Sequence, residues 1–150
     1  MRYEDLRTEF EVDGSLRDIY AFNTTLIEWN RVLDLFPRVG RVTYFRDAEE
    51  APLPSAAEQI FADVAHAKLL RCDLGGPVIN AHFFTPDEIE LDVDPCEITT
   101  QTDLDLVLDF CARLAREIQR DLRITPENAP QIVCLSYSLE DEMWRRSERP

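Results

Sequence analysis

Four carboxylates stand at alternate positions of one short stretch of the chain, DEIELDVDP at positions 87–95. They belong to Glu88, Glu90, Asp92 and Asp94. Apolar residues separate them, so the alternation predicts a strand with one face in a core and an acidic face turned away from it. Such a row of carboxylates could bind a divalent cation, assist a histidine in acid–base catalysis, or receive the basic surface of another protein.

The pattern disfavours a metal site. Residues at i and i+2 of a strand point in parallel about 6–7 Å apart, whereas Ca²⁺ needs six to eight oxygens that converge on one point. The four cysteines form no C-x-x-C pair, and the chain has two histidines. We therefore expect no metal and no cofactor, and the phosphate-binding and common catalytic motifs (GxGxxG, GxxxxGK[ST], HExxH, GxSxG) are absent as well.

Catalysis remains as an alternative through His82 and Glu90. The segments KLLRCDL, PVINAHFF and EIELDVD are three successive predicted strands, and the Gly-Gly turn between the first two sets their register. That register places Arg71 opposite Asn80, Asn80 opposite Asp92, and His82 opposite Glu90. A histidine that is held by a carboxylate can act as a general base. The same arrangement also occurs as an ordinary polar pair across two strands.

A binding face is the interpretation that we favour. Between positions 72 and 112 the chain has ten acidic residues and no Lys or Arg, and its net charge is −14. The residues that we assign to this face are Arg71, Asn80, His82, Phe84, Glu88, Glu90, Asp92 and Asp94. The alternative is that arginines from elsewhere in the chain, such as Arg71, Arg41, Arg46 or those of the tail, fold back over the acids and neutralise them.

The charge argues against nucleic acid and membrane as partners, because both attract basic surfaces. In size, charge and lack of a catalytic motif the chain is similar to small acidic bacterial immunity proteins, which block basic toxin nucleases. The sequence thus predicts a non-enzymatic cytoplasmic protein that binds a basic protein. The alternatives are a small hydrolase-like enzyme that uses His82 and Glu90, and a homo-oligomer in which the partner is a second copy.

The elements that must position these residues follow from periodicity. The chain predicts one α+β domain over residues 1–150, with about six mostly antiparallel strands in the order β-α-β-α-β-β-β-α-β and three helices on one face of the sheet. The first helix is expected to begin at Thr25 and end at Pro37. The second begins with a Ser55–Glu58 capping box and buries Val64.

The longest predicted helix runs through TTQTDLDLVLDFCARLAREIQRDL as far as Leu122. Its apolar residues recur at a helical period, so we expect Leu108, Cys111, Ala115 and Ile118 to be buried against the sheet. A proline-rich loop, a last strand in QIVCLSYSL and a frayed, charged tail complete the expected order.

Overall fold

The computed structural model describes residues 1–148, and its centre is one antiparallel sheet. In this part of the chain the sheet has nine strands, in the spatial order β3-β2-β4-β5-β6-β1-β7-β8-β9. Their bounds are β1 Arg17–Phe22, β2 Arg41–Arg46, β3 Glu49–Ala51, β4 Lys68–Asp73, β5 Val78–His82, β6 Glu88–Val93, β7 Leu122–Pro126, β8 Leu135–Ser138 and β9 Met143–Arg146. The α+β class is confirmed, but the expected number of about six strands is too low.

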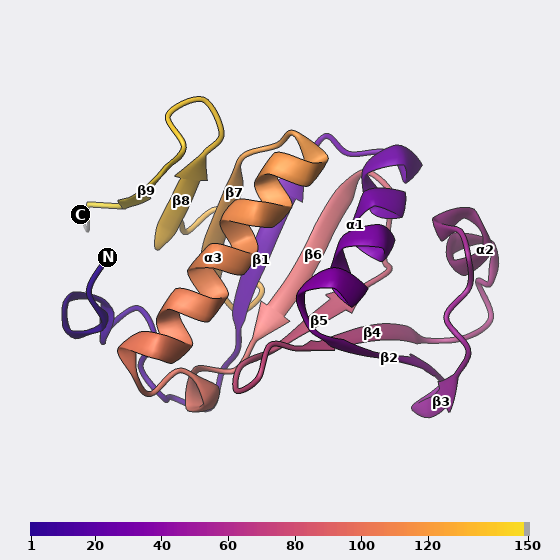
Figure 1. The fold of residues 1–150 in the computed structure, drawn as a ribbon, viewed down its shortest axis with the longest axis horizontal. Helices are drawn as coiled ribbons and strands as arrows, with labels where there is room; N and C mark the ends of the chain where they lie inside the picture. The colour runs from indigo at the N-terminus through magenta and orange to yellow at the C-terminus, as the bar shows by residue number, and fades with distance from the viewer. Residues whose placement is uncertain (149–150) are drawn as a thin grey trace.

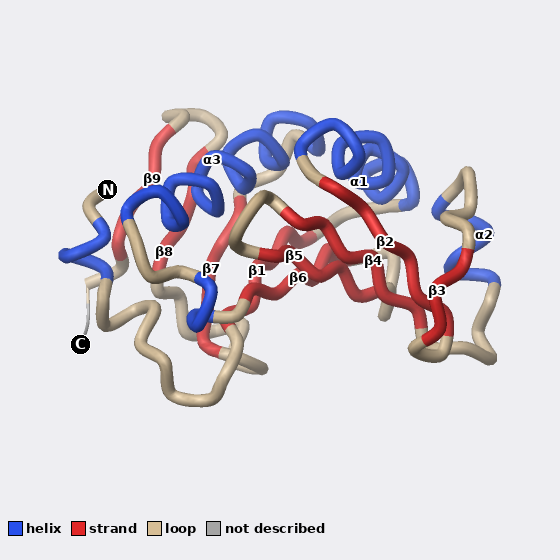
Figure 2. Tube along the Cα trace, turned by 60° about the horizontal axis from the view of Figure 1, so that its bottom comes forward, coloured by secondary structure: helices blue, strands red, loops and turns tan. Residues whose placement is uncertain are grey.

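Two long helices cover one face of this sheet. The helical elements are α1 Leu26–Val39, α2 Ala57–Ala62 and α3 Gln101–Ile118, with short 3-10 helices η1 Tyr3–Leu6 and η2 Pro95–Glu97. Helices α1 and α3 lie on the same side of the sheet, and the short α2 lies near its β3 end (Figures 1 and 2). The opposite side, which we call the open face, carries neither α1 nor α3.

Side-chain caps fix where both long helices begin. The Thr25 hydroxyl accepts from the Ile27 N–H, and the Glu28 carboxylate accepts from the Thr25 N–H at 2.8 Å. Thr100 and Asp103 form the same arrangement at the start of α3. These bonds satisfy amide groups that have no partner within the helix, so the predicted start of α1 is confirmed.

Three expectations about α1 and α2 are wrong. Helix α1 continues past Pro37 to Val39, because a proline in the last turn removes only one internal hydrogen bond. Helix α2 has Ala56 as its N-cap and no side-chain cap, so Ser55 and Glu58 form no capping box. That helix also ends at Ala62, which leaves Val64 87% exposed.

Two of the strands that the sequence analysis missed lie near the C-terminus. The predicted end of α3 at Leu122 is wrong: the helix stops at Ile118 because Gln119 adopts a left-handed conformation (φ 55°), and Leu122 begins β7. The charged tail forms β9, which pairs with β8 and packs Trp144 against Tyr137. The Arg146 guanidinium there also binds the Glu9 carboxylate, so the two ends of the chain meet.

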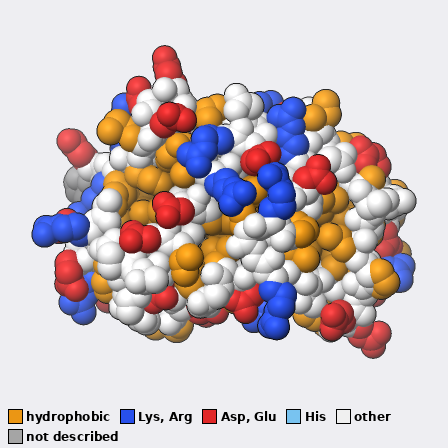
Figure 3. All heavy atoms as spheres, in the orientation of Figure 1, with side chains coloured by type: hydrophobic (Ala, Val, Ile, Leu, Met, Phe, Trp, Pro, Cys, Tyr) orange, Lys and Arg blue, Asp and Glu red, His pale blue; other side chains and the backbone are white. Residues whose placement is uncertain are grey.

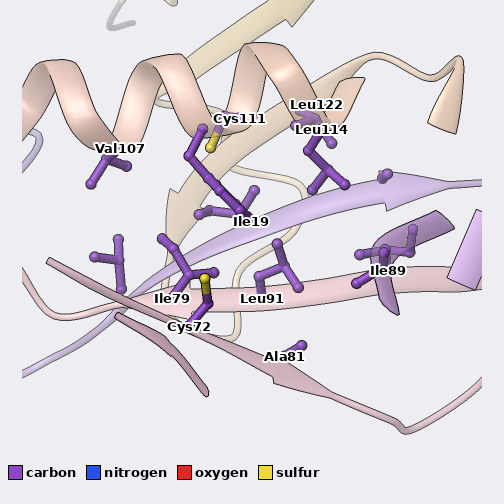
Figure 4. Packing of buried hydrophobic residues seen from close by; sticks show 14 of the residues in the cluster. Ile19, Cys72, Ile79, Ala81, Ile89, Leu91, Val107, Cys111, Leu114 and Leu122 are labelled. Carbon is purple, nitrogen blue, oxygen red and sulfur yellow. The ribbon is translucent and has the colours of Figure 1, made fainter. Parts of the chain in front are cut away.

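The core lies between α1, α3 and the sheet. Figure 4 shows strand residues such as Ile19, Ile79 and Leu91 packed toward Cys111 and Leu114 of α3. The four residues of α3 that the periodicity assigned to the core are at most 5% exposed. The predicted buried face of α3 is therefore confirmed. Within residues 1–148, no helix has the length and apolar character needed to span a membrane.

Candidate functional site

The open face of β4, β5 and β6 brings the predicted site residues together. Arg71 lies opposite Asn80, Asn80 opposite Asp92, and His82 opposite Glu90. The two hairpins therefore have the register that the alternating pattern and the Gly-Gly turn predicted, and this part of the prediction is confirmed. A slip of one residue would have turned the carboxylates into the core.

His82 is bonded to Asp92 and not to the expected Glu90. Its Nε2 lies 2.5 Å from Asp92 Oδ2, and the Asn80 amide donates to Asp92 Oδ1 at 3.0 Å. Asp92 is only 5% exposed, so this carboxylate is held inside the face by two neighbours of β5. The hydrogen bond to Asp92 raises the pKa of His82 above its ordinary value, against the effect of burial. The imidazole also stacks on the Phe84 ring, with the centroids 5.5 Å apart.

A second polar group on the same face comes from β1, which lies beside β6. The Tyr20 hydroxyl lies 3.1 Å from Asp18 Oδ2 and 3.4 Å from Glu90 Oε1, and the Asn128 N–H donates to Asp18 at 2.7 Å. Burial raises the pKa of Asp18, and the nearby Asp92 carboxylate adds to this effect. Burial also raises the pKa of Glu90, with a further contribution from Asp18.

The sequence analysis did not include Asp18 and Tyr20 in the site. Their signal is the alternation in RDIYAF, where Asp18, Tyr20 and Phe22 occupy every second position of one strand. The alternation indicates that they share a face. It does not indicate that this strand lies beside β6, because β1 and β6 are about 70 residues apart in the chain.

The four carboxylates at positions 88, 90, 92 and 94 therefore differ in burial and in hydrogen bonding. Asp92 is buried and bonded, and Asp94 accepts the Cys96 N–H at 2.8 Å as the cap of η2. Glu88 and Glu90 are half-buried on the open face. These two glutamates are the ones available to an external cation.

Arginines of the same chain do not neutralise Glu88 and Glu90. In residues 1–148, neither glutamate has an ion pair with Lys or Arg within 4.0 Å. Four of the suggested bases pair elsewhere: Arg41 with Asp73, Arg46 with Asp63, Arg145 with Asp141 and Arg146 with Glu9. Arg71 has no ion pair within residues 1–148, and Arg149 of the tail lies outside the described residues.

Many of the basic side chains lie on the opposite side of the molecule. Figure 3 views the helix-covered face, where Lys and Arg side chains gather near the centre. Arg31 and Arg38 of α1 bridge the two long helices, since both bond to Glu117 of α3. On the open face, Arg123 of β7 lies over the Phe22 ring at 4.8 Å and donates to the Pro130 carbonyl. Basic side chains therefore lie on both faces, but within residues 1–148 none of them forms an ion pair with Glu88 or Glu90.

A hollow of about 750 Å³ adjoins His82 at the end of β4 and β5. We call it the aromatic hollow. Its lining consists of Phe45, Ala48, Phe61, Val64, His66, Ala67, Lys68, Leu69, Arg71, Asn80, His82, Phe83 and Phe84. This size and largely apolar lining are typical of sites for small molecules. As for metals, residues 1–148 contain no group of three or more His, Cys, Asp or Glu side chains placed to hold an ion.

Comparisons of the chain with models of known protein families, with curated proteins and with solved structures found no match.

Proposed function

We propose that this chain is a non-catalytic binding protein that receives the basic surface of a partner protein on its open face. The contact would centre on Glu88 and Glu90 of β6, with Phe84 and Phe22 beside them. The observation that carries the proposal is the pair of half-buried glutamates with no Lys or Arg ion pair in residues 1–148. An immunity or inhibitor role toward a basic toxin is its most concrete form.

The electrostatics of the face support a cationic partner. The raised pKa of Glu90 reflects burial and the carboxylates of Asp18 and Glu88, so the ionised face is repulsive within itself. A guanidinium or ammonium placed between the two glutamates would relieve that repulsion. The exposed Phe84, whose relative accessibility is 69%, supplies apolar area next to the charges, as the centre of a protein interface requires.

Replacing the two glutamates tests this proposal. A partner is first captured from lysate of the source cells, identified, purified and measured against the chain by surface plasmon resonance. Glu88→Gln with Glu90→Gln should reduce the association rate about tenfold or more at low salt, because complementary charge acts chiefly on encounter. The wild-type rate should also fall as salt rises, since screening weakens the attraction.

The matched control is Asp34→Asn with Asp109→Asn. It removes the same charge from exposed positions of α1 and α3 on the other face. If the control slows association as much as the glutamate variant does, only net charge matters and the proposed contact is wrong.

The His82–Asp92 pair favours a second candidate, a small acid–base enzyme. The buried Asp92 carboxylate fixes the imidazole through Nε2, and His82 Nδ1 makes no hydrogen bond to any residue in 1–148. An oriented imidazole with one open nitrogen beside a hollow is the arrangement that general bases use. If the chain is this enzyme, His82→Gln should abolish turnover and leave the association rate with a protein partner unchanged.

A further inference from the structure

The aromatic hollow differs in charge from the rest of the molecule. The chain has a net charge of −14, yet the hollow has no Asp or Glu in its described lining. Its charged and polar side chains are His66, Lys68, Arg71, Asn80 and His82. Although the chain is acidic overall, the polar side chains that line this hollow are all cationic, imidazole or amide groups.

Two of these cations have no ion pair within residues 1–148. The Arg71 side chain makes neither a hydrogen bond nor an ion pair there, although its charge acts on Glu97 at the far end of the β4–β5 hairpin. Lys68, the one lysine of the chain, donates to the backbone carbonyl of Asp63 and pairs with no carboxylate. Arg46 nearby is different, because Asp63 binds it at 2.7 Å. The charges of Arg71 and Lys68 are thus open to a ligand.

The strand register places Arg71 and His82 so that both can donate to one anionic group of a ligand. Arg71 lies opposite Asn80, and His82 is two residues further along the same face of β5. Such diagonal neighbours are about 7–8 Å apart, which long side chains can bridge. Asp92 holds the His82 ring by Nε2, so Nδ1 is the nitrogen that remains for a ligand.

The remaining side chains that line the hollow are mostly aromatic or aliphatic, which favours the flat apolar part of a ligand. Phe45 and Leu69 line it from the open face, and Phe61 and Val64 line it from α2 and the segment that follows. Phe84 lies parallel to the His82 ring at an interplanar angle of 3°, and it is exposed. An exposed aromatic surface of this kind favours stacking with a planar group.

We propose that the aromatic hollow binds a small organic anion with a planar apolar body, whose anionic group is held by Arg71 and His82. Charge complementarity selects the anion, and the phenylalanine and leucine walls select the flat apolar part. This site shares Phe84 with the glutamate contact of the proposed function, but it does not use Glu88 or Glu90 and does not rest on that proposal.

The test uses 2-naphthoate as the probe and 2-naphthamide as its neutral counterpart, with binding to the full chain measured by NMR titration in 0.15 M salt. The expected result is binding of the naphthoate with shifts at Leu69, Asn80 and Phe84, and at least tenfold weaker binding of the amide. Equal affinity for the two probes, or no binding of naphthoate at 10 mM, would overturn the proposal.

Arg71→Gln provides the decisive variant, because this side chain has no partner whose loss would unfold the chain. It should weaken naphthoate binding about tenfold and change amide binding little. Arg41→Gln is the matched control, since Arg41 is 87% exposed, pairs with Asp73 and lies outside the hollow. An equal loss in both variants would mean that naphthoate responds to overall charge, and the proposal would fail. Glu88→Gln with Glu90→Gln should keep naphthoate binding, so the two proposals can fail independently.

Discussion

At the scale of single residues, the polar network of the open face depends on which carboxylate the His82 imidazole bonds to. The register sets His82 opposite Glu90, but the imidazole turns to Asp92, which is diagonal to it. Asp92 is the more buried carboxylate and already accepts from Asn80. A buried carboxylate without donors costs more free energy than a half-exposed one, so the imidazole stabilises the fold most where it satisfies Asp92.

Replacing His82 should reveal this pairing, because the difference in free energy of unfolding between wild type and the variant should depend on pH. The charges around its ring come from Asp92 and Glu90 of β6, Asp18 of β1 and Arg71 of β4. The folded-state pKa of His82 is raised, so its contribution is fully present below the unfolded pKa of about 6.5 and is lost as pH rises through the folded value. Urea unfolding of wild type and His82→Gln should thus differ more at pH 5.5 than at pH 9. A difference that is the same at both pH values would contradict a charged His82–Asp92 pair.

At the scale of elements, α3 packs against β7, β8 and α1 and so covers one part of the sheet. Its apolar residues face the strands along its whole length, from Leu104 to Ile118. Its first turn carries the Thr100–Asp103 capping box, and Gln119 closes its end. The helix thus holds the sheet from one side only, and the open face stays available.

Shortening a buried side chain of α3 should measure this support. Leu108→Ala removes methyl groups from a side chain that is 5% exposed, and we expect a loss of about 2–5 kcal/mol in the free energy of unfolding. Val64→Ala is the control, because Val64 is 87% exposed and should change stability by less than about 0.5 kcal/mol. Urea denaturation of both variants checks the prediction, and a loss for Leu108 no larger than that for Val64 would refute it.

At the scale of the whole molecule, both faces carry acidic and basic side chains, but these pair differently on the two faces. Arginines of α1 bridge to α3 on the covered face, while Glu88 and Glu90 face outward on the other side without a basic ion-pair partner in residues 1–148. Like charges on neighbouring strands destabilise a sheet by a few tenths of a kcal/mol for each pair. The open face therefore carries a repulsion that, for Glu90, the Tyr20 hydroxyl and His82 offset only in part.

Neutralising the two glutamates should leave the fold intact or make it more stable. Glu88→Gln with Glu90→Gln removes the repulsion with Asp18 and keeps an acceptor for the Tyr20 hydroxyl. Thermal unfolding at pH 7.5 should give a melting temperature that is level or raised. A fall of several degrees would indicate that the glutamates are paired within the chain, contrary to the structure.

The sequence by itself determined the parts of this protein that depend on neighbours along the chain. The alternation in β6 and the Gly-Gly turn predicted the β4–β5–β6 register, and the 3.6-residue period predicted the buried side of α3. Each of these signals is local, because a strand or helix that faces a core must repeat its apolar residues at its own period. The α+β class followed from the same patterns.

Only the tertiary structure decided what lies beside these elements. It placed β1 next to β6, which brought Asp18 and Tyr20 to the site, and it turned the charged tail into β9. In the folded chain, His82 also bonds to Asp92, and the segment that follows α2 lines one side of the aromatic hollow. Pairings between distant strands, and the choice between two carboxylates within reach, depend on the burial and packing of the complete fold, which no local period encodes.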